Sequence, residues 1–158
     1  MKRFLIPSLL ILTLILAACS ATPASLPSDS NPASASSGNS TAQFDSAMRT
    51  DGQGAIIFEV TPFNLNAPAD TLEFDIVLTT HSIDLSMDLA PLAILTTDTG
   101  VTVSATLWDA PRGGHHVEGK LIFPASVDGK SLLDGATKLT LTILNVDAPS
   151  RVFEWGMQ

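Results

Sequence analysis

Alternation of apolar and polar side chains is the dominant pattern in the carboxyl-terminal two thirds of the chain. Between residues 71 and 78 the even-numbered positions are apolar, and Glu73 and Asp75 lie between them. Residues 82–89 repeat the pattern, with apolar side chains at the odd-numbered positions. A period of two places alternate side chains on opposite faces of an extended backbone. Both segments are therefore predicted to be strands with one buried face.

Similar runs predict six further strands, at residues 55–63, 93–97, 101–108, 116–123, 138–146 and 151–155. Turn-forming residues separate them, as at Asp98-Thr99-Gly100 and Pro111-Arg112-Gly113-Gly114. Short strands at this spacing predict an all-β fold, an antiparallel immunoglobulin-like sandwich of about 7–8 strands. A β-barrel is the alternative architecture. Trp155 shares its phase with Phe153 in the last strand, so it is expected in the core.

The amino terminus has the plan of a signal peptide. Lys2 and Arg3 precede a thirteen-residue, mostly apolar run at residues 4–16. A membrane-spanning helix needs about 20 apolar residues, so this run is too short to serve as one. It ends in Leu16-Ala17-Ala18-Cys19, where Cys19 is the only cysteine of the chain.

The segment Leu16-Ala17-Ala18-Cys19 resembles the lipobox of bacterial lipoproteins. The resemblance implies cleavage before Cys19, diacylglycerol on its sulfur, and an acyl chain such as palmitate on the new amino terminus. It therefore implies an exported protein of the bacterial cell envelope, anchored to the membrane by lipid at Cys19, with its domain on the extracytoplasmic side. The alternative is an ordinary secreted protein in which Cys19 is a free thiol.

Residues 20–43 follow as a stretch rich in Ser, Ala, Pro and Thr, in which only Leu26 is a sizeable apolar side chain. Such a composition cannot bury enough apolar surface to offset the entropy of ordering, and it is typical of a flexible linker. We therefore divide the chain into a lipoprotein signal peptide (1–18), a lipidated Cys19 with a disordered linker (19–43), and a β-sandwich domain (44–158).

The net charge of −8 argues against a nucleic-acid partner, since phosphate backbones are bound by clustered Lys and Arg side chains. Removal of the signal peptide leaves six basic and sixteen acidic side chains, a net charge of −10. The exported chain is thus even more acidic than the precursor.

Four segments of the folded region carry a second resemblance: residues 60–65, 80–85, 113–116 and 151–155. They resemble an uncharacterised family of exported bacterial β-sandwich domains. The resemblance implies a small exported domain, and it implies no activity.

The three histidines are the candidate metal ligands. His81 opens a predicted strand, and His115 and His116 follow Gly113-Gly114. Neutral imidazole binds both Zn²⁺ and Cu²⁺. Adjacent side chains of a regular strand point to opposite faces, so His115 and His116 could share one ion only if the glycine pair keeps the backbone irregular. The alternative places all three imidazoles in exposed loops and strand ends, with no cofactor.

Catalytic patterns are missing from the sequence: it contains neither Gly-x-Ser-x-Gly nor a glycine-rich phosphate loop. We expect no enzymatic activity, and a small hydrolase with unrecognised acids is the remaining catalytic hypothesis. Trp108 falls out of phase with Val101, Val103, Ala105 and Leu107, which predicts that it faces away from the core. It is the candidate contact for an envelope protein or a glycan, and a place at the edge of the core is its alternative.

Together these features predict a lipid-anchored binding or structural module of the cell envelope. An envelope metal-binding protein using His81, His115 and His116 is the alternative.

Overall fold

The computed structural model describes residues 42–158, and Cys19 with the lipobox-like segment lies outside these residues. The strands are β1 (Arg49–Asp51), β2 (Ile56–Pro62), β3 (Thr71–Thr80), β4 (Ala93–Thr97), β5 (Thr102–Ser104), β6 (Leu107–Asp109), β7 (His116–Pro124), β8 (Ser126–Val127), β9 (Lys130–Ser131), β10 (Lys138–Leu144) and β11 (Ser150–Gly156). A 3-10 turn, η1 (Ala90–Leu92), precedes β4. Within the described part of the chain, no helix is long and apolar enough to cross a membrane.

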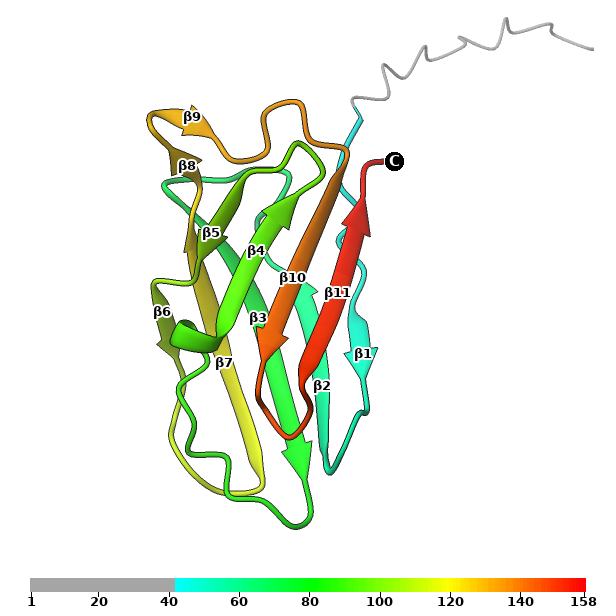
Figure 1. Ribbon diagram of the computed structural model, residues 1–158, viewed down its shortest axis with the longest axis vertical. Coiled ribbons are helices and arrows are strands. Elements are labelled where there is room, and N and C mark those ends of the chain that lie inside the picture. Colours follow the sequence, from blue (N-terminus) through cyan, green and yellow to red (C-terminus); the bar gives the residue numbers. More distant parts are fainter. Residues whose placement is uncertain (1–41) are drawn as a thin grey trace, which may run out of the picture. The chain divides into compact units, whose positions relative to one another are not determined.

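Two antiparallel sheets lie face to face (Figure 1). The five-stranded sheet has the order β1-β2-β3-β7-β6, and the four-stranded sheet has the order β11-β10-β4-β5. The short β8 and β9 pair with each other as a separate hairpin. The predicted all-β antiparallel sandwich is confirmed, with additional short strands beyond the expected seven or eight.

The chain visits the two sheets in alternation, one hairpin at a time. Hairpins β2–β3 and β6–β7 belong to the five-stranded sheet, and hairpins β4–β5 and β10–β11 belong to the four-stranded sheet. In immunoglobulin-like sandwiches the strands lettered in chain order form one sheet A-B-E-D and another with the order C-F-G. The order β2-β3-β7-β6 opposite β4-β10-β11 reproduces that arrangement, with β1 and β5 added at the edges.

Period-two alternation produces the core between the sheets. In β3 the buried and partly buried positions alternate along all ten residues. The ring centroids of Phe74 on β3 and Trp155 on β11 lie 5.3 Å apart, so they join the two sheets through the core. Burial of each large apolar side chain contributes about 1.5–3 kcal/mol. Trp155 is fully buried, which confirms its expected place in the core.

The strand predicted at residues 82–89 is wrong. Residues 81–89 connect β3 in one sheet to η1 and β4 in the other. Leu85 and Leu89 are buried, but the backbone pairs only where Leu85 exchanges hydrogen bonds with Gly113 and Gly114. Alternation records which side chains are buried. A connection that crosses over the core can therefore have alternating apolar and polar residues without pairing with another strand.

The single strand predicted at residues 101–108 is also wrong, and so is the outward orientation predicted for Trp108. The chain leaves the four-stranded sheet after β5 and enters the five-stranded sheet at β6. This crossing shifts the phase by one residue, so that both Val103 and Trp108 point inward while Leu107 points outward. Trp108 is only 6% exposed. Its indole therefore offers no exposed platform to a partner, contrary to the expectation for this residue.

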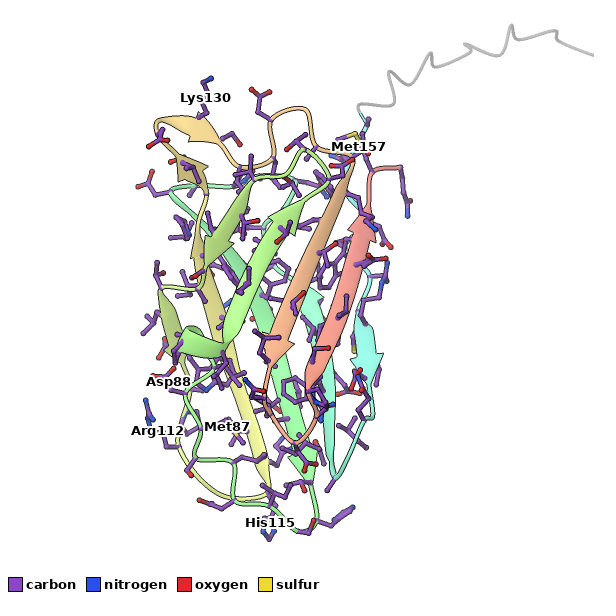
Figure 2. The ribbon with its side chains drawn as sticks, in the orientation of Figure 1. Met87, Asp88, Arg112, His115, Lys130 and Met157 are labelled. Atoms are coloured by element: carbon purple, nitrogen blue, oxygen red, sulfur yellow. The ribbon has the colours of Figure 1, made fainter. Side chains whose placement is uncertain are left out.

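The sandwich has two distinct ends. The end that we call the tether end holds Phe44 and Met157, which pair in an isolated bridge, together with the β8–β9 hairpin. The opposite, distal end holds the turns that follow β1, β3, β6 and β10 (Figure 1). Figure 2 shows Lys130 and Met157 near the tether end and His115 at the distal end. The described chain therefore begins at one end of the sandwich, and the loops with the histidines lie at the other.

Candidate functional site

The three histidines are exposed. His115 lies at the distal end (Figure 2), His81 follows the last residue of β3, and His116 is the first residue of β7. His116 begins β7, where its Nδ1 lies 3.1 Å from Thr79 Oγ1 and its Nε2 lies 2.9 Å from Glu118 Oε1. The carbonyl of His115 accepts a hydrogen bond from the amide of Thr80, the residue before His81. The fold thus brings the backbones of His81 and His115 to the same place.

A shared metal site is not evident from these positions. Within residues 42–158 no group of three or more His, Cys, Asp or Glu side chains is arranged to hold a metal ion. The Zn²⁺ or Cu²⁺ hypothesis stays a prediction. Titration of the full chain with either ion tests it, and an affinity no tighter than micromolar would contradict it.

Two distal loops are fastened to each other next to the histidines. Asp84 Oδ1 accepts a hydrogen bond of 2.8 Å from the amide of Gly114. Arg112 Nη2 contacts Asp88 Oδ2 at 3.2 Å (the two residues are labelled in Figure 2). Gly113 and Gly114 have φ angles of 88° and 92°, a left-handed conformation that glycine adopts without steric cost. The glycine pair therefore shapes the loop, which presents the backbone of residue 114 to Asp84.

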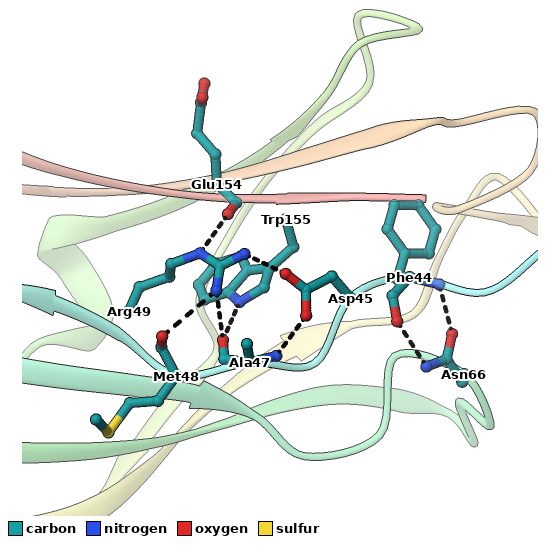
Figure 3. A network of polar contacts seen from close by, with 8 residues as sticks. All are labelled: Phe44, Asp45, Ala47, Met48, Arg49, Asn66, Glu154 and Trp155. Atoms are coloured by element: carbon teal, nitrogen blue, oxygen red, sulfur yellow. Dashed lines mark hydrogen bonds and ion pairs between the residues drawn. The ribbon is translucent and has the colours of Figure 1, made fainter. Parts of the chain in front are cut away.

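The segment before β2, residues 43–53, forms an amino-terminal strap along the free edge of β11. Figure 3 shows its first part: the indole Nε1 of Trp155 donates to the carbonyl of Ala47 at 2.8 Å, and Arg49 Nε donates to the carbonyl of Glu154 at 3.0 Å. The amide of Asp45 donates to the carbonyl of Gly156. The strap therefore covers backbone groups that an edge strand would otherwise present to solvent.

Side chains of the strap also hold one another. The Arg49 guanidinium is ion-paired with Asp45, and the Asp45 carboxylate accepts a hydrogen bond from the amide of Ala47 (Figure 3). The hydrogen bond from Arg49, followed by that from Ala47, holds the pKa of Asp45 below its ordinary value. Asn66, in the loop after β2, exchanges two hydrogen bonds with the backbone of Phe44. The first described residues are thus fixed on both sides.

A buried arginine, Arg151, holds the carboxyl-terminal part of the strap. Arg151 is 0% exposed, and its guanidinium is ion-paired with Asp51. Its Nε and Nη2 donate to the carbonyls of Val146 and Gln53 at 3.1 and 2.5 Å, and its guanidinium carbon lies 4.4 Å from the centroid of the Phe58 ring. Arg151 therefore joins the strap, the β10–β11 turn and β2, and we call this set of contacts the Arg151 clamp.

The environment of Asp51 favours its charged form. Partial burial acts to raise the pKa of Asp51, but the hydrogen bonds from Gln53 and the charge and hydrogen bond of Arg151 outweigh it. The net result is a pKa below the ordinary value. The Asp51 carboxylate is therefore charged at neutral pH.

The Arg151 clamp was not predicted from the sequence. Arg151 shares its phase with Phe153 and Trp155, so the alternation already indicated that its side chain points inward. Asp51 lies 100 positions earlier in the chain, in a segment with no strand pattern. The sequence pattern therefore indicated that Arg151 points inward, but it did not indicate that Asp51 is its ion-pair partner.

A comparison with known proteins identifies no relative of this chain. No protein-family model, no curated protein and no solved structure matches this chain. A function for this chain must therefore be inferred from its own fold and residues.

Proposed function

We propose that this chain is a lipid-anchored module of the bacterial cell envelope, and that it acts through binding or structural contacts. The observation that carries the proposal is Leu16-Ala17-Ala18-Cys19 at the end of a short apolar run behind Lys2 and Arg3. Two acyl chains or more hold a protein stably on a membrane, whereas one does so only marginally. Lipidation at Cys19 would supply that anchor.

The arrangement of the domain supports the proposal. Residues 20–41 have the composition of a linker, and the described chain begins at the tether end of the sandwich. A domain attached there would have its point of attachment at the end opposite its distal loops. The strap would connect the linker to the core through Arg49, Trp155 and Arg151.

Metabolic labelling tests the anchor. The full chain is expressed in a bacterium with an alkyne analogue of palmitate, and its label and membrane fraction are compared with those of Cys19→Ser. We expect label and membrane association in the unaltered chain and neither in Cys19→Ser. The double variant Cys19→Ser/Ser25→Cys is the matched control, because it keeps one thiol but breaks the motif. Label that persists in Cys19→Ser, or an unaltered chain without label, would refute the proposal.

A further inference from the structure

The outward side chains of the five-stranded sheet differ in kind from those of the rest of the described surface. Of the six exposed large apolar side chains within residues 42–158, four belong to this sheet or its margins. They are Met48, Ile57, Phe63 and Leu107, each between 47% and 62% exposed. Exposed apolar side chains are ordinary when scattered singly, as Ile57 is, six residues from Phe63 along β2 and so about 20 Å away. Phe63 and Leu107 lie in one row across the sheet, with Glu73 and Ile122 between them, and such a cluster among polar groups marks an interaction site.

The strand register places these side chains on one face. Leu107 on β6 pairs with Ile122 on β7, and Ile57 on β2 pairs with Thr79 on β3. Arg49 pairs with the buried Val60, so the preceding Met48 takes the outward side. Figure 3 shows the Met48 side chain pointing away from β11.

Carboxylates lie between the apolar side chains of this face. Its outward positions carry Glu59, Glu73, Asp75, Asp109 and Glu118, with Lys120 as the one Lys or Arg among them. We call this set of outward side chains, the four apolar residues, the five carboxylates and Lys120, the acidic–apolar face.

Lys120 does not present a free positive charge to a partner. Its Nζ lies 2.8 Å from Asp75 Oδ1 and 3.5 Å from Glu73 Oε2. The same atom lies 3.7 Å from the centroid of the Phe63 ring, a cation–π contact. The ammonium thus holds the exposed Phe63 ring in place, and an aromatic side chain that is already ordered loses little entropy on binding.

The outer face of the four-stranded sheet provides an internal comparison. Its outward positions include four threonines, Thr96, Thr102, Thr140 and Thr142, and the partly buried Ile94 and Leu144. Lys138 and Glu154 form an ion pair at 2.7 Å, and Val152 is the only large apolar side chain that is strongly exposed there, at 52%. This face is close to neutral and has fewer strongly exposed apolar side chains than the five-stranded sheet.

We infer that the acidic–apolar face is a docking surface for a protein partner whose contact surface sets Lys and Arg side chains around apolar ones. Opposite charge accelerates encounter and fixes orientation, while a few buried aromatic and aliphatic anchors supply most of the affinity. The carboxylates repel anionic lipid and nucleic acid, so neither suits this face. The inference rests on the proposed role as a binding module, and it names the chemistry of the partner.

Peptide binding tests the inference with a defined probe. A fluorescent peptide of alternating Lys and Leu is titrated against the full chain in non-ionic detergent, and its anisotropy is measured. Peptides of alternating Lys and Ser, and of alternating Glu and Leu, separate charge from apolar contact. We expect the Lys–Leu peptide to bind about tenfold more tightly than the Lys–Ser peptide, and the Glu–Leu peptide not to bind.

Surface variants locate the binding. Phe63→Ser/Leu107→Ser is expected to weaken binding of the Lys–Leu peptide about tenfold, and Glu59→Gln/Glu118→Gln is expected to weaken it and reduce its salt dependence. Val152→Ser, equally exposed on the other sheet, is the matched control and should bind like the unaltered chain. Circular dichroism checks that each variant is folded. Amide chemical-shift changes in the unaltered, isotope-labelled chain locate the peptide without any substitution.

The inference is overturned if Phe63→Ser/Leu107→Ser binds like the unaltered chain, if Val152→Ser weakens binding as much, or if the shift changes lie outside the five-stranded sheet. All measurements are repeated with Cys19→Ser in the background. Because peptide binding does not require lipid, failure of the anchor and failure of the docking surface give different results.

Discussion

Arg151 illustrates how a buried charge can organise a small sandwich. Its guanidinium has no exposed surface, and such a charge is tolerated only where it is paired and hydrogen-bonded. Asp51 supplies the opposite charge, and the carbonyls of Val146 and Gln53 accept two of the remaining donors. Arg151 therefore joins the β10–β11 turn to the strap and β2, which lie about 90 to 100 positions earlier in the chain.

Replacing Asp51 by Asn is expected to destabilise the fold strongly. The substitution leaves the Arg151 guanidinium buried without its counter-charge, which typically costs about 3–5 kcal/mol. Urea unfolding monitored by tryptophan fluorescence measures the free energy of unfolding. Arg112→Met, which removes an exposed ion pair with Asp88, is the control and should change stability by less than about 1 kcal/mol. Equal effects of the two substitutions would contradict this account of the Arg151 clamp.

Acid is expected to destabilise the domain through the same carboxylate. The pKa of Asp51 in the fold lies below its ordinary value of 3.8, so the unfolded chain binds the proton more readily. The resulting stabilisation is present above the unfolded pKa and is lost as the pH falls through the folded pKa. Asp45, Asp98 and Glu154, whose pKa values are also lowered, contribute in the same direction.

Urea unfolding at a series of pH values measures this dependence. We expect the free energy of unfolding to fall between about pH 5 and pH 2, and to fall less steeply in Asp51→Asn. A variant whose pH dependence equals that of the unaltered chain would show that Asp51 does not contribute.

At the scale of elements, the packing of β6 against β7 depends on a missing side chain. Gly119 occupies an inward position of β7, between the buried Val117 and Leu121. A Cβ atom there would lie 2.7 Å from the carbonyl oxygen of Asp109 and 2.8 Å from Cη2 of Trp108, and it would also collide with Ala110. The indole of Trp108 thus occupies the space above Gly119.

Gly119→Ala is therefore expected to destabilise the domain, since one methyl group would displace both the backbone of β6 and the Trp108 ring. Overpacking of this kind typically costs about 1–3 kcal/mol. Thermal unfolding with fluorescence detection measures the loss and reports a change around Trp108. Gly52→Ala is the matched control, because no atom beyond its neighbours in the chain lies within 4 Å of the added carbon. A melting temperature that falls no further in Gly119→Ala than in Gly52→Ala would be inconsistent with this packing.

Elements were predictable from the sequence where local pattern and long-range pairing agree. The alternation at residues 71–78 predicted β3, because this strand pairs on both sides and buries every second side chain. The same alternation at residues 82–89 misled, because burial there comes from a crossing between sheets. Residues 101–108 misled for a related reason, since no local signal marks the change of sheet at Ala105 and Thr106.

The candidate site, too, could be predicted from the sequence only in part. The exposure of His81, His115 and His116 agrees with loops and a strand end, which the turn residues around them indicate. The acidic–apolar face was not predicted. Leu107 lies more than 40 residues after Ile57 and Phe63, and only the register of the five-stranded sheet shows that the three share a face.

At the scale of the whole molecule, Gln43 and Phe44 lie at one end of the sandwich. Their position determines which surfaces would stay accessible in a domain anchored through its amino-terminal segment. Phe44 is held at the tether end by Met157 and Asn66. Both outer faces run from that end toward the distal loops, so anchoring through residues 19–43 would leave the acidic–apolar face accessible along its length. The net charge of −10 expected after processing would also keep neighbouring copies and anionic lipid apart.

This arrangement predicts how the protein responds to limited proteolysis on membranes. Residues 20–41 combine a linker composition with few apolar side chains, whereas residues from 43 onward are hydrogen-bonded to the carboxyl terminus, as in the pair Gln43 and Gln158. A brief treatment of membranes with a protease of broad specificity is therefore expected to release one soluble fragment that begins before residue 44. Mass spectrometry of the released material identifies its first residue. Cleavage within residues 56–156 before release would contradict a stable domain, and a domain that stays on the membrane after the linker is cut would place an attachment inside the sandwich.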